Sequence, residues 1–505
     1  MNRYDVVIAG SGMGGLLCGD LLSREGYRVC ILEKNKQIGG CLQIYARDRV
    51  IFDSGVHYIG GLAPGQNLYK IFHYLGLMDK LKLERMDADA FDKIMIEGDD
   101  TVYPLAQGYE NFIRQLLPHF PEEGEALHRY CEKIRTICSK FPLYNLRSGD
   151  YAEKESELGA DTSAFIDSLT ANQKLRAVLA GNNFLYAGQA DKTPLYVHAL
   201  IQNHYIESAW KCTDGGNRIG QLMAASIRAS GGAVLTGREV CRFVEEAGKI
   251  TRVETTGGAS FYGNIFISNM HPEKTLQMTA SQLIRPVFRK RISSLENSVS
   301  SFTLNIVLKE DCFPYEAANY YYHRPGYAWS AADYTTANWP LAFAVFLSPG
   351  RGNKKFAAGM SLLTYMRFDE VREWAGTVNT AAAPAGRGTA YEQFKEQKAS
   401  ALLDEAEKKF PGLRNCIHSY YTATPLSFRD YIGNADGSMY GIVKNYRDPH
   451  RTFIPPRTKL PNLYFTGQNL NLHGILGTAL SGLATCMSIL GNDSLLEKIN
   501  HEEKK

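Results

Sequence analysis

The sequence predicts an α/β fold in which a parallel, nucleotide-binding sheet is interrupted by an inserted α+β region with a mostly antiparallel sheet. Three observations predict it. The stretch "YDVVIAGSGMGGLLCGDLLSREGYRVCILE" runs from an apolar strand through a glycine turn to a helix and a second strand. The stretch "CTDGGNRIGQLMAASIRASGGAVLTGREV" returns to that pattern, and "LPNLYFTGQNLNLHGILG" adds a third strand, turn and helix. Because longer segments of different character separate these blocks, the sheet is assembled from distant parts of the chain.

The first block has the spacing of a dinucleotide-binding turn. A β-branched strand at 6–9 leads into G-x-G-x-x-G, formed by Gly10, Gly12 and Gly15, where a helix over 13–23 begins. The first glycine makes the turn, the second lets the backbone approach a pyrophosphate, and the third packs the helix on the strand. The helix N-terminus offers its free N–H groups to the phosphates.

The residues after this helix select the nucleotide. Gly26 ends the helix, and Glu33 stands at the tip of the second strand, where its carboxylate can accept hydrogen bonds from both ribose hydroxyls. A 2′-phosphate would be repelled there, which excludes NADP. The pair Gly39 and Gly40 follows the acidic strand end and gives a long cofactor room beyond the pyrophosphate. FAD is therefore favoured over NAD.

Composition narrows the function classes. The chain has 505 residues, too many for one compact core, so we expect two domains. A net charge of +3 with scattered Lys and Arg gives no nucleic-acid footprint. The ten cysteines form neither C-x-x-C nor a Cys/His cluster, so no disulfide framework or metal site is indicated and a reducing compartment is expected. With no room for a signal peptide and no apolar run of membrane-spanning length, we expect a cytoplasmic protein.

The segments between the nucleotide-binding blocks predict a second layer of structure. We expect helices within 68–81, 125–141, 190–210 and 391–410 from their apolar periodicity, and an exposed loop over 377–390. Strands are expected at "FDKIMIEG", "TVYPL", "SFTLNIVL", "LAFAVFL" and "AAGMSLLTYM", the last three in another, largely antiparallel sheet. The predicted domains are a discontinuous FAD-binding domain of residues 1–75, 205–275 and 455–500 and a substrate-binding domain of residues 76–204 and 276–454.

The C-terminal block predicts the flavin end of the site. A strand over 463–466 ends in T-G, after which Gln468 can face a ribityl or pyrophosphate oxygen. The helix that starts near Gly474 points its dipole at the N1–C2 region of a flavin, where negative charge gathers on reduction.

The blocks "GSGMGG" with "LEKNKQIGGC", "GGAVLTGREV" with "FISNMHP", and "LYFTGQNLNLHGILG" resemble the FAD-dependent phytoene desaturase and carotenoid isomerase group. The segments "FDSGVHYIG", "VHALIQNHYIESAW" and 410–442 extend this resemblance over nearly the whole chain. It implies a two-domain flavoprotein of the GR2 type, whose second sheet roofs an apolar channel. It also implies an FAD-dependent oxidoreductase that acts on CH–CH groups: it saturates, desaturates or isomerises a C=C bond of an apolar conjugated polyene or isoprenoid, with hydride transfer through flavin N5. Because one dinucleotide fingerprint is present, the electron donor or acceptor is expected to be external.

The resemblance assigns cofactor contacts residue by residue. Val240 matches the strand residue whose main chain faces adenine. Gln468 stands where many flavoproteins place an Asp, and His473 is unexplained. The FAD-binding residues predicted in this way are Gly10, Gly12, Met13, Gly14, Gly15, Glu33, Lys34, Gly40, Cys41, Val56, Val240, Gly467, Gln468, Gly474, Ile475 and Leu476.

Two residues are candidates for catalysis. In related amine oxidases, a segment similar to "FDSGVHYIG" passes along the flavin ring, which would bring Val56, His57 and Tyr58 near N5. We expect His57 or Tyr58 to supply the proton that accompanies hydride delivery. A structural role for the histidine is the alternative.

Other functions stay open at this point. One is an amine oxidase-like enzyme on a small substrate, with rings of "YEAANYYYH" beside the flavin, although "NYYYH" is more simply a strand with aromatic faces. Another is a lipid-binding flavoprotein whose FAD is structural. The segments "FIRQLLPHF" and "SKFPLYNL" are either half-buried helices of the substrate domain or a peripheral membrane contact through which an apolar substrate enters.

Overall fold

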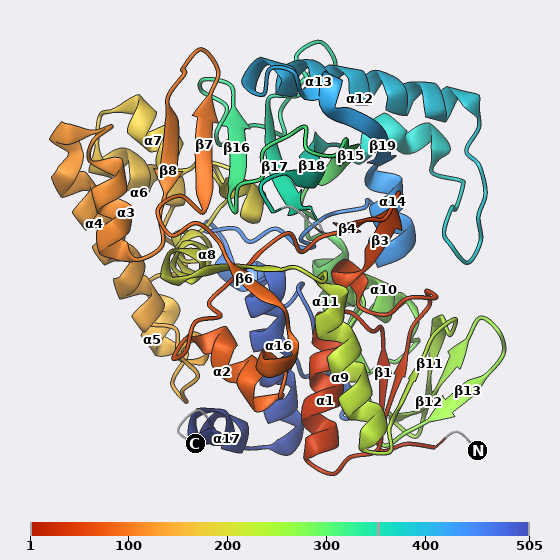
Figure 1. Cartoon of the computed structure of the whole chain (residues 1–505). Helices are drawn as coiled ribbons and strands as arrows, with labels where there is room; N and C mark the ends of the chain where they lie inside the picture. The colour runs from red at the N-terminus through yellow and green to blue at the C-terminus, as the bar shows by residue number, and fades with distance from the viewer. Residues whose placement is uncertain (1–2, 351–353, 503–505) are drawn as a thin grey trace.

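A five-stranded parallel sheet forms the lower half of the molecule in Figure 1, in a computed structural model that describes residues 3–350 and 354–502. Its strand order is β10-β2-β1-β14-β20, and all neighbours are parallel. These strands are β1 (Val6–Ala9), β2 (Val29–Leu32), β10 (Ala233–Leu235), β14 (Ile265–Ser268) and β20 (Leu463–Phe465). Pairing of strands from three blocks of the chain confirms the predicted Rossmann-like sheet.

Helix α1 (Met13–Arg24) packs between α9 (Asn217–Ala229) and α16 (Gly474–Leu490) on one face of this sheet (Figure 1). Small residues allow the close approach. A Cβ added at Gly19 would lie 2.8 Å from Ile31 Cδ1, and one at Gly482 would lie 2.5 Å from Leu17 Cδ2. On the other face lies an antiparallel sheet of β11 (Val240–Glu246), β12 (Lys249–Thr255) and β13 (Ser260–Tyr262).

A seven-stranded sheet forms the upper half of the molecule (Figure 1). Its order is β19-β15-β18-β17-β16-β7-β8, antiparallel except for the parallel pair β16 and β7. Its strands are β7 (Asp92–Ile96), β8 (Val102–Leu105), β15 (Ser300–Leu308), β16 (Asn319–His323), β17 (Ala342–Pro349), β18 (Ala357–Met366) and β19 (Ile417–Ala423). The strand expectations, including "NYYYH", agree with this sheet.

The central strands of this sheet are buried on both faces. All nine residues of β15 are buried. On one face, the Tyr322 hydroxyl donates to Glu405 of the long helix α12 (Thr389–Lys409) at 3.5 Å. Because neighbouring strand residues alternate, Tyr321 points the opposite way, toward the parallel sheet. The space between the two sheets is where the site lies.

Smaller elements complete the fold. Sheet β5-β9-β6 and hairpin β3-β4 join the two halves, and helices α3 to α8 stand at one side of the large sheet (Figure 1). The strands are β3 (Ile44–Arg47), β4 (Val50–Asp53), β5 (Ile59–Gly60), β6 (Leu83–Arg85) and β9 (Ala209–Cys212). The remaining helices are α2 (Asn67–Tyr74), α3 (Tyr109–Leu116), α4 (Gly124–Ser139), α5 (Ala152–Glu155), α6 (Thr162–Leu169), α7 (Gln173–Leu179), α8 (Leu195–Glu207), α10 (Pro272–Gln277), α11 (Pro286–Ser293), α13 (Leu413–Cys416), α14 (Pro425–Ile432), α15 (Pro449–Thr452) and α17 (Ser494–Glu502).

The structure corrects the expectation about cysteines. Cys312 and Cys416 form a disulfide, with Cα atoms 5.5 Å apart. Pairing of β15 with β19 places Leu308 opposite Ile417, which brings the segments next to these strands together. A separation of 104 residues hides such a pair from spacing motifs. The other eight cysteines are free thiols, so the expected compartment stays a prediction.

The two segments considered for membrane contact turn their apolar side chains inward. Those that are buried are Phe112, Ile113, Leu116, Phe120, Phe141, Tyr144 and Leu146. This burial agrees with the alternative of half-buried helices. Within residues 3–350 and 354–502, no helix combines the length and apolar character needed to cross a bilayer.

Candidate cofactor and substrate site

The glycine turn after β1 is held by close backbone contacts. Gly10 has a φ of +98°, which L side chains rarely adopt. A Cβ added at Gly15 would lie 2.1 Å from the Gly10 carbonyl oxygen, and one at Gly14 would lie 2.9 Å from Gly467 Cα. Glycine is required at both positions because backbone occupies the space of a side chain. The turn from β20 thus meets the turn from β1.

Glu33 is fixed at the end of β2. One carboxylate oxygen accepts from the Ser11 amide at 3.0 Å and the Ser11 hydroxyl at 2.6 Å, and the other accepts from the Asn35 amide at 2.8 Å. The side chain is 4% exposed and lines a cavity. Its position suits a ribose, and its hydrogen bonds to ribose hydroxyls remain a prediction.

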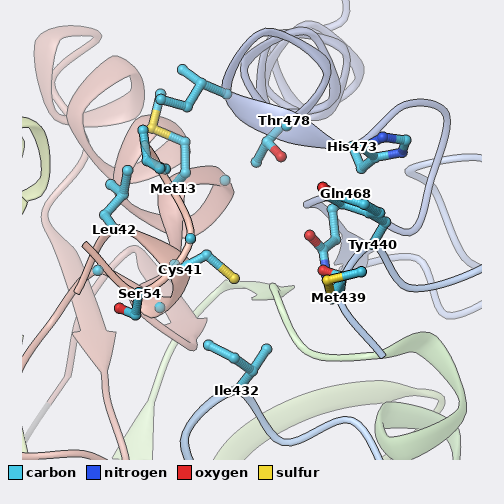
Figure 2. A pocket seen from close by; sticks show the side chains of 18 of the residues that line it. Met13, Cys41, Leu42, Ser54, Ile432, Met439, Tyr440, Gln468, His473 and Thr478 are labelled. Atoms are coloured by element: carbon cyan, nitrogen blue, oxygen red, sulfur yellow. The ribbon is translucent and has the colours of Figure 1, made fainter. Parts of the chain in front are cut away.

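One cavity begins at this turn, and Figure 2 shows part of its lining. The lining continues to residues of the seven-stranded sheet, among them Tyr321, Phe346 and Leu363. Most residues predicted from the sequence line it. Those that do are Gly10, Gly12, Met13, Gly14, Glu33, Lys34, Gly40, Cys41, Val56, His57, Tyr58, Val240, Gln468, Gly474, Ile475 and Leu476. Gly15 and Gly467 lie directly behind the wall, against Gly10 and Gly14. Contact with a cofactor stays a prediction for each residue.

The middle of the cavity lies at the start of α16. His473 occupies the N-cap position of this helix without a side-chain capping bond, and its Nε2 instead lies 3.0 Å from the Leu185 carbonyl oxygen. The centroid of its ring lies 4.4 Å from that of Tyr440. Both residues are labelled in Figure 2. Burial lowers the pKa of His473 to about 4, so the ring is neutral at physiological pH. The Gln468 amide donates to the Met439 carbonyl at 3.5 Å, which directs it across the cavity. His473, unexplained by the resemblance, anchors the loop before α16.

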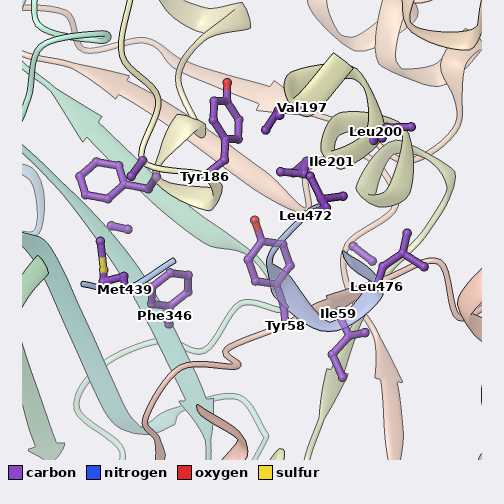
Figure 3. Packing of buried hydrophobic residues seen from close by; sticks show 14 of the residues in the cluster. Tyr58, Ile59, Tyr186, Val197, Leu200, Ile201, Phe346, Met439, Leu472 and Leu476 are labelled. Carbon is purple, nitrogen blue, oxygen red and sulfur yellow. The ribbon is translucent and has the colours of Figure 1, made fainter. Parts of the chain in front are cut away.

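The far end of the cavity is apolar and aromatic (Figure 3). In the register of the large sheet, Tyr321 pairs with Ala344, which pairs with Leu363, so these residues share one face. Tyr321, Phe346 and Leu363 form the roof. Opposite them lie apolar side chains of α8 and of the loop before α16, including Leu200, Ile201 and Leu472.

His57 lies against this roof. Its ring stacks on that of Phe346 at 4.0 Å with an interplanar angle of 4°. Burial, assisted by the charge of Lys211, lowers the pKa of His57 to about 3. Lys211 itself donates to the carbonyl of Leu347. At that pKa His57 is a neutral imidazole at physiological pH and cannot act as an imidazolium acid.

Tyr58 enters the cavity beside His57, and its hydroxyl is hydrogen-bonded. That hydroxyl donates to Asp92 at 2.9 Å and lies 2.8 Å from the Tyr321 hydroxyl. Burial, together with the charge of Asp92, raises the pKa of Tyr58 far above its ordinary value.

The structure adds residues that the sequence did not single out. Asn269 follows β14, and a Cβ added at Gly12 would lie 2.8 Å from its Nδ2. In the sequence, Asn269 lies in "FISNMHP", directly after a strand. Its position at a strand end was the signal that could have identified it as a site residue. From "YEAANYYYH", Tyr321 lines the cavity, whereas Tyr320 donates to Glu316 and Tyr322 faces α12. Only strand alternation distinguishes these rings.

Comparisons with known proteins agree with this geometry. Residues 8–75 match the NAD(P)-binding Rossmann-like domain family. All-trans-retinol 13,14-reductase of Rattus norvegicus is 27% identical, over 97% of this chain and 86% of its own. Chloroplastic prolycopene isomerase of Daucus carota is 22% identical, over 98% of this chain and 81% of its own.

Solved structures share the fold. An oxidoreductase from Methanosarcina mazei has a TM-score of 0.65 at 15% identity, and the match covers 97% of this chain and 100% of the other. Putrescine oxidase, solved with putrescine bound, has a TM-score of 0.63 at 12% identity, covering 97% and 99%. The chain is a flavin-dependent oxidoreductase that is similar, over nearly its full length, to all-trans-retinol 13,14-reductases and prolycopene isomerases.

Proposed function

We propose that this protein binds FAD and acts on a C=C bond of an apolar conjugated polyene or isoprenoid. The observation that carries the proposal is the cavity itself, which joins a glycine turn and an acidic strand end to an aromatic compartment. A dinucleotide fits the first part, and a hydrocarbon chain fits the second. Relatives named for reduction of retinol and isomerisation of prolycopene support this class of substrate.

The residues at the polar end fit FAD. Glu33 would bind the adenosine ribose, the main chain at Val240 would face adenine, and the turn from Gly10 to Gly15 would hold the pyrophosphate. The N-terminus of α16 would face the isoalloxazine ring beside Gln468. When bound, FAD supplies two-electron hydride transfer at N5. An external donor or acceptor would exchange electrons with it.

We propose the same division into domains as the sequence predicts. The strands of the parallel sheet lie within residues 1–75, 205–275 and 455–500, and those of the seven-stranded sheet within 76–204 and 276–454. The β5-β9-β6 sheet takes strands from both. The cavity lies between the two large sheets. One domain would therefore hold FAD, and the other would hold the polyene that reacts with it.

The chain's own residues would orient the polyene, exclude water and handle a proton. Tyr321, Phe346 and Leu363 form an apolar roof against which a flat conjugated chain can lie. Of the two catalytic candidates, we favour Tyr58 as the proton donor, because its hydroxyl is hydrogen-bonded to Asp92 and Tyr321, whereas a neutral His57 cannot act as an imidazolium acid. His57 would instead brace the roof through its stack on Phe346.

An anaerobic absorbance experiment tests the proposal. Protein reconstituted with FAD is photoreduced and mixed with all-trans-retinol or a carotenoid. We expect the flavin to reoxidise as the polyene band moves to shorter wavelength, or the band to shift without net flavin oxidation for an isomerase. Unchanged polyenes together with peroxide release from amines would instead identify an amine oxidase. A flavin that no reductant or substrate perturbs would indicate a structural cofactor.

A further inference from the structure

A buried carboxyl lies behind the cavity wall, and the proposed function has not used it. Asp92, at the start of β7, is 0% exposed. Its Oδ2 accepts from the Tyr58 hydroxyl at 2.9 Å and from the Asn182 amide at 3.0 Å, and its Oδ1 accepts from the Asn319 amide at 2.9 Å. All three donors are uncharged. Burying a carboxylate among neutral partners is costly, which favours uptake of a proton.

Neighbouring elements hold this carboxyl in place. Asn319 is the residue paired with Asp92 across β16 and β7, so its amide sits beside the carboxyl by register. Asn182 is oriented in turn by Gln202 of α8, whose amide donates to it at 2.6 Å. Acids that are buried and held by specific partners cluster at functional sites, which makes Asp92 a candidate for proton transfer.

Two phenols connect Asp92 to the cavity. The hydroxyls of Tyr58 and Tyr321 lie 2.8 Å apart, and both residues line the cavity. Each hydroxyl has one proton. When Asp92 is ionised, Tyr321 donates to Tyr58 and Tyr58 donates to Asp92, so no proton points into the cavity. When Asp92 is protonated, the direction can reverse: Asp92 donates to Tyr58, Tyr58 to Tyr321, and the Tyr321 proton is free to face a substrate.

We propose that Asp92, Tyr58 and Tyr321 form a proton relay that delivers a proton to one carbon of the substrate double bond. This inference rests on the proposed function. In this step the π bond would break, one carbon would gain the hydride that bound, reduced FAD would supply, and the other would gain the proton of the Tyr321 hydroxyl. Tyr321 takes the proton of Tyr58, Tyr58 takes that of Asp92, and Asp92 is left as a carboxylate. After the product has left the cavity, water reprotonates Asp92 through the hydroxyls of Tyr321 and Tyr58.

The electrostatics are consistent with this direction. Burial raises the pKa of Asp92 to about 6, and its three hydrogen bonds limit the rise. The titratable groups that face it are the phenols of Tyr58, Tyr321 and Tyr205, and burial together with the Asp92 charge raises the pKa of each. Asp92 is therefore the group that exchanges a proton near neutral pH. Asp92 therefore holds the proton that the relay delivers below about pH 6 and has lost it above that pH.

The first test follows the carboxyl itself and needs no substrate. Infrared difference spectra between the wild type and Asp92→Asn, recorded from pH 4 to 8, isolate the Asp92 carbonyl stretch. We expect the carbonyl band of protonated Asp92 to disappear with a midpoint near pH 6. The band should shift in Tyr58→Phe, because this variant removes the hydroxyl that is hydrogen-bonded to Asp92. An Asp92 that stays ionised to pH 5, or a band that ignores Tyr58→Phe, would overturn the relay.

The second test follows the reaction in single turnovers of photoreduced, FAD-loaded protein with all-trans-retinol. Asp92→Asn, Tyr58→Phe and Tyr321→Phe should each be at least about 100-fold slower, the usual scale of general acid catalysis. The wild-type rate should fall above about pH 6, and this pH dependence should disappear in Asp92→Asn. The matched control is Tyr365→Phe, a buried tyrosine whose hydroxyl has no hydrogen-bond partner in the described part of the chain.

The outcomes separate the relay from the proposed function. If the wild type is active and its three variants match Tyr365→Phe in rate and pH profile, the relay is wrong and the proposed function stands. A wild type that leaves every polyene unchanged overturns the proposed function, and the infrared titration then decides whether Asp92 and Tyr58 share a proton. Flavin affinity measured for every variant shows that the fold is intact. Should Asp92→Asn fail to fold, Tyr321→Phe carries the same rate prediction.

Discussion

The two ends of the cavity are built in different ways. The nucleotide end consists mainly of backbone, and its glycines are close together in the chain, from Gly10 to Gly15. The aromatic end consists of side chains, and the Tyr58 and Tyr321 hydroxyls that meet there are 263 residues apart. The nucleotide end depends on positions where the backbone leaves no room for a Cβ atom. The aromatic end depends on which strands pair, because pairing brings its side chains together. Four predictions test this difference.

The largest effect is expected at the nucleotide end. Gly15→Ala places a methyl group 2.1 Å from the Gly10 carbonyl oxygen, so the turn must open. We expect loss of flavin from the purified protein, with an affinity at least about 100-fold weaker, equivalent to about 2.7 kcal/mol. Flavin absorbance after gel filtration measures it. Gly257→Ala, where a Cβ meets nothing within 4 Å, should retain flavin. Equal retention by both variants would show that the turn tolerates side chains.

At the aromatic end, two phenylalanines of β17 form a matched pair. Phe346 lines the cavity, and Phe343 stacks on Tyr322 on the opposite face of the sheet. Truncating either residue to alanine should lower the free energy of unfolding by about 3 to 5 kcal/mol. Polyene affinity, measured by quenching of protein fluorescence, should weaken about tenfold or more in Phe346→Ala and stay unchanged in Phe343→Ala. The same loss in both variants would place the substrate elsewhere.

Between the two ends, His473 should make stability depend on pH. Its pKa is about 4 in the folded protein against about 6.5 unfolded, so the unfolded chain binds a proton first as the pH falls. Stability from this group is complete above pH 6.5 and is lost between about pH 6.5 and 4, by up to about 3 kcal/mol. Urea unfolding at pH 7.5 and 4.5 measures it. The pH dependence should be smaller in His473→Gln than in the control His119→Gln on the exposed surface. An unchanged slope would mean that His473 is accessible to protons.

The smallest effect is expected from the charge of Glu33. Glu33→Gln keeps the size of the side chain but replaces a charged acceptor, so FAD affinity should weaken about tenfold, equivalent to about 1.4 kcal/mol. Fluorescence titration of the flavin measures it. Glu310→Gln, at an exposed position, serves as the control. Tighter binding of FAD by Glu33→Gln would contradict a role in holding the ribose.

The sequence came close to the structure where contacts are local. The first strand was expected at 6–9 and is Val6–Ala9, and the helix expected over 13–23 is Met13–Arg24. It failed for the disulfide between Cys312 and Cys416, which depends on the pairing of β15 with β19. Strand alternation separates Tyr321 from Tyr320 and Tyr322, but only the packing of the sheet decides which of its faces borders the cavity.

The sequence by itself determined the first strand, the glycine turn, the helix and Glu33 at the end of the second strand, because these elements follow one another within 30 residues. The family resemblance then identified the two later blocks that complete the parallel sheet. Only the tertiary structure decided what the cavity becomes. It placed Asp92 behind Tyr58, brought Tyr321 beside them from another strand, and turned Phe346 onto His57. The physical reason is that burial and hydrogen bonding between distant segments set the proton affinity of each group, and strand register sets which segments meet.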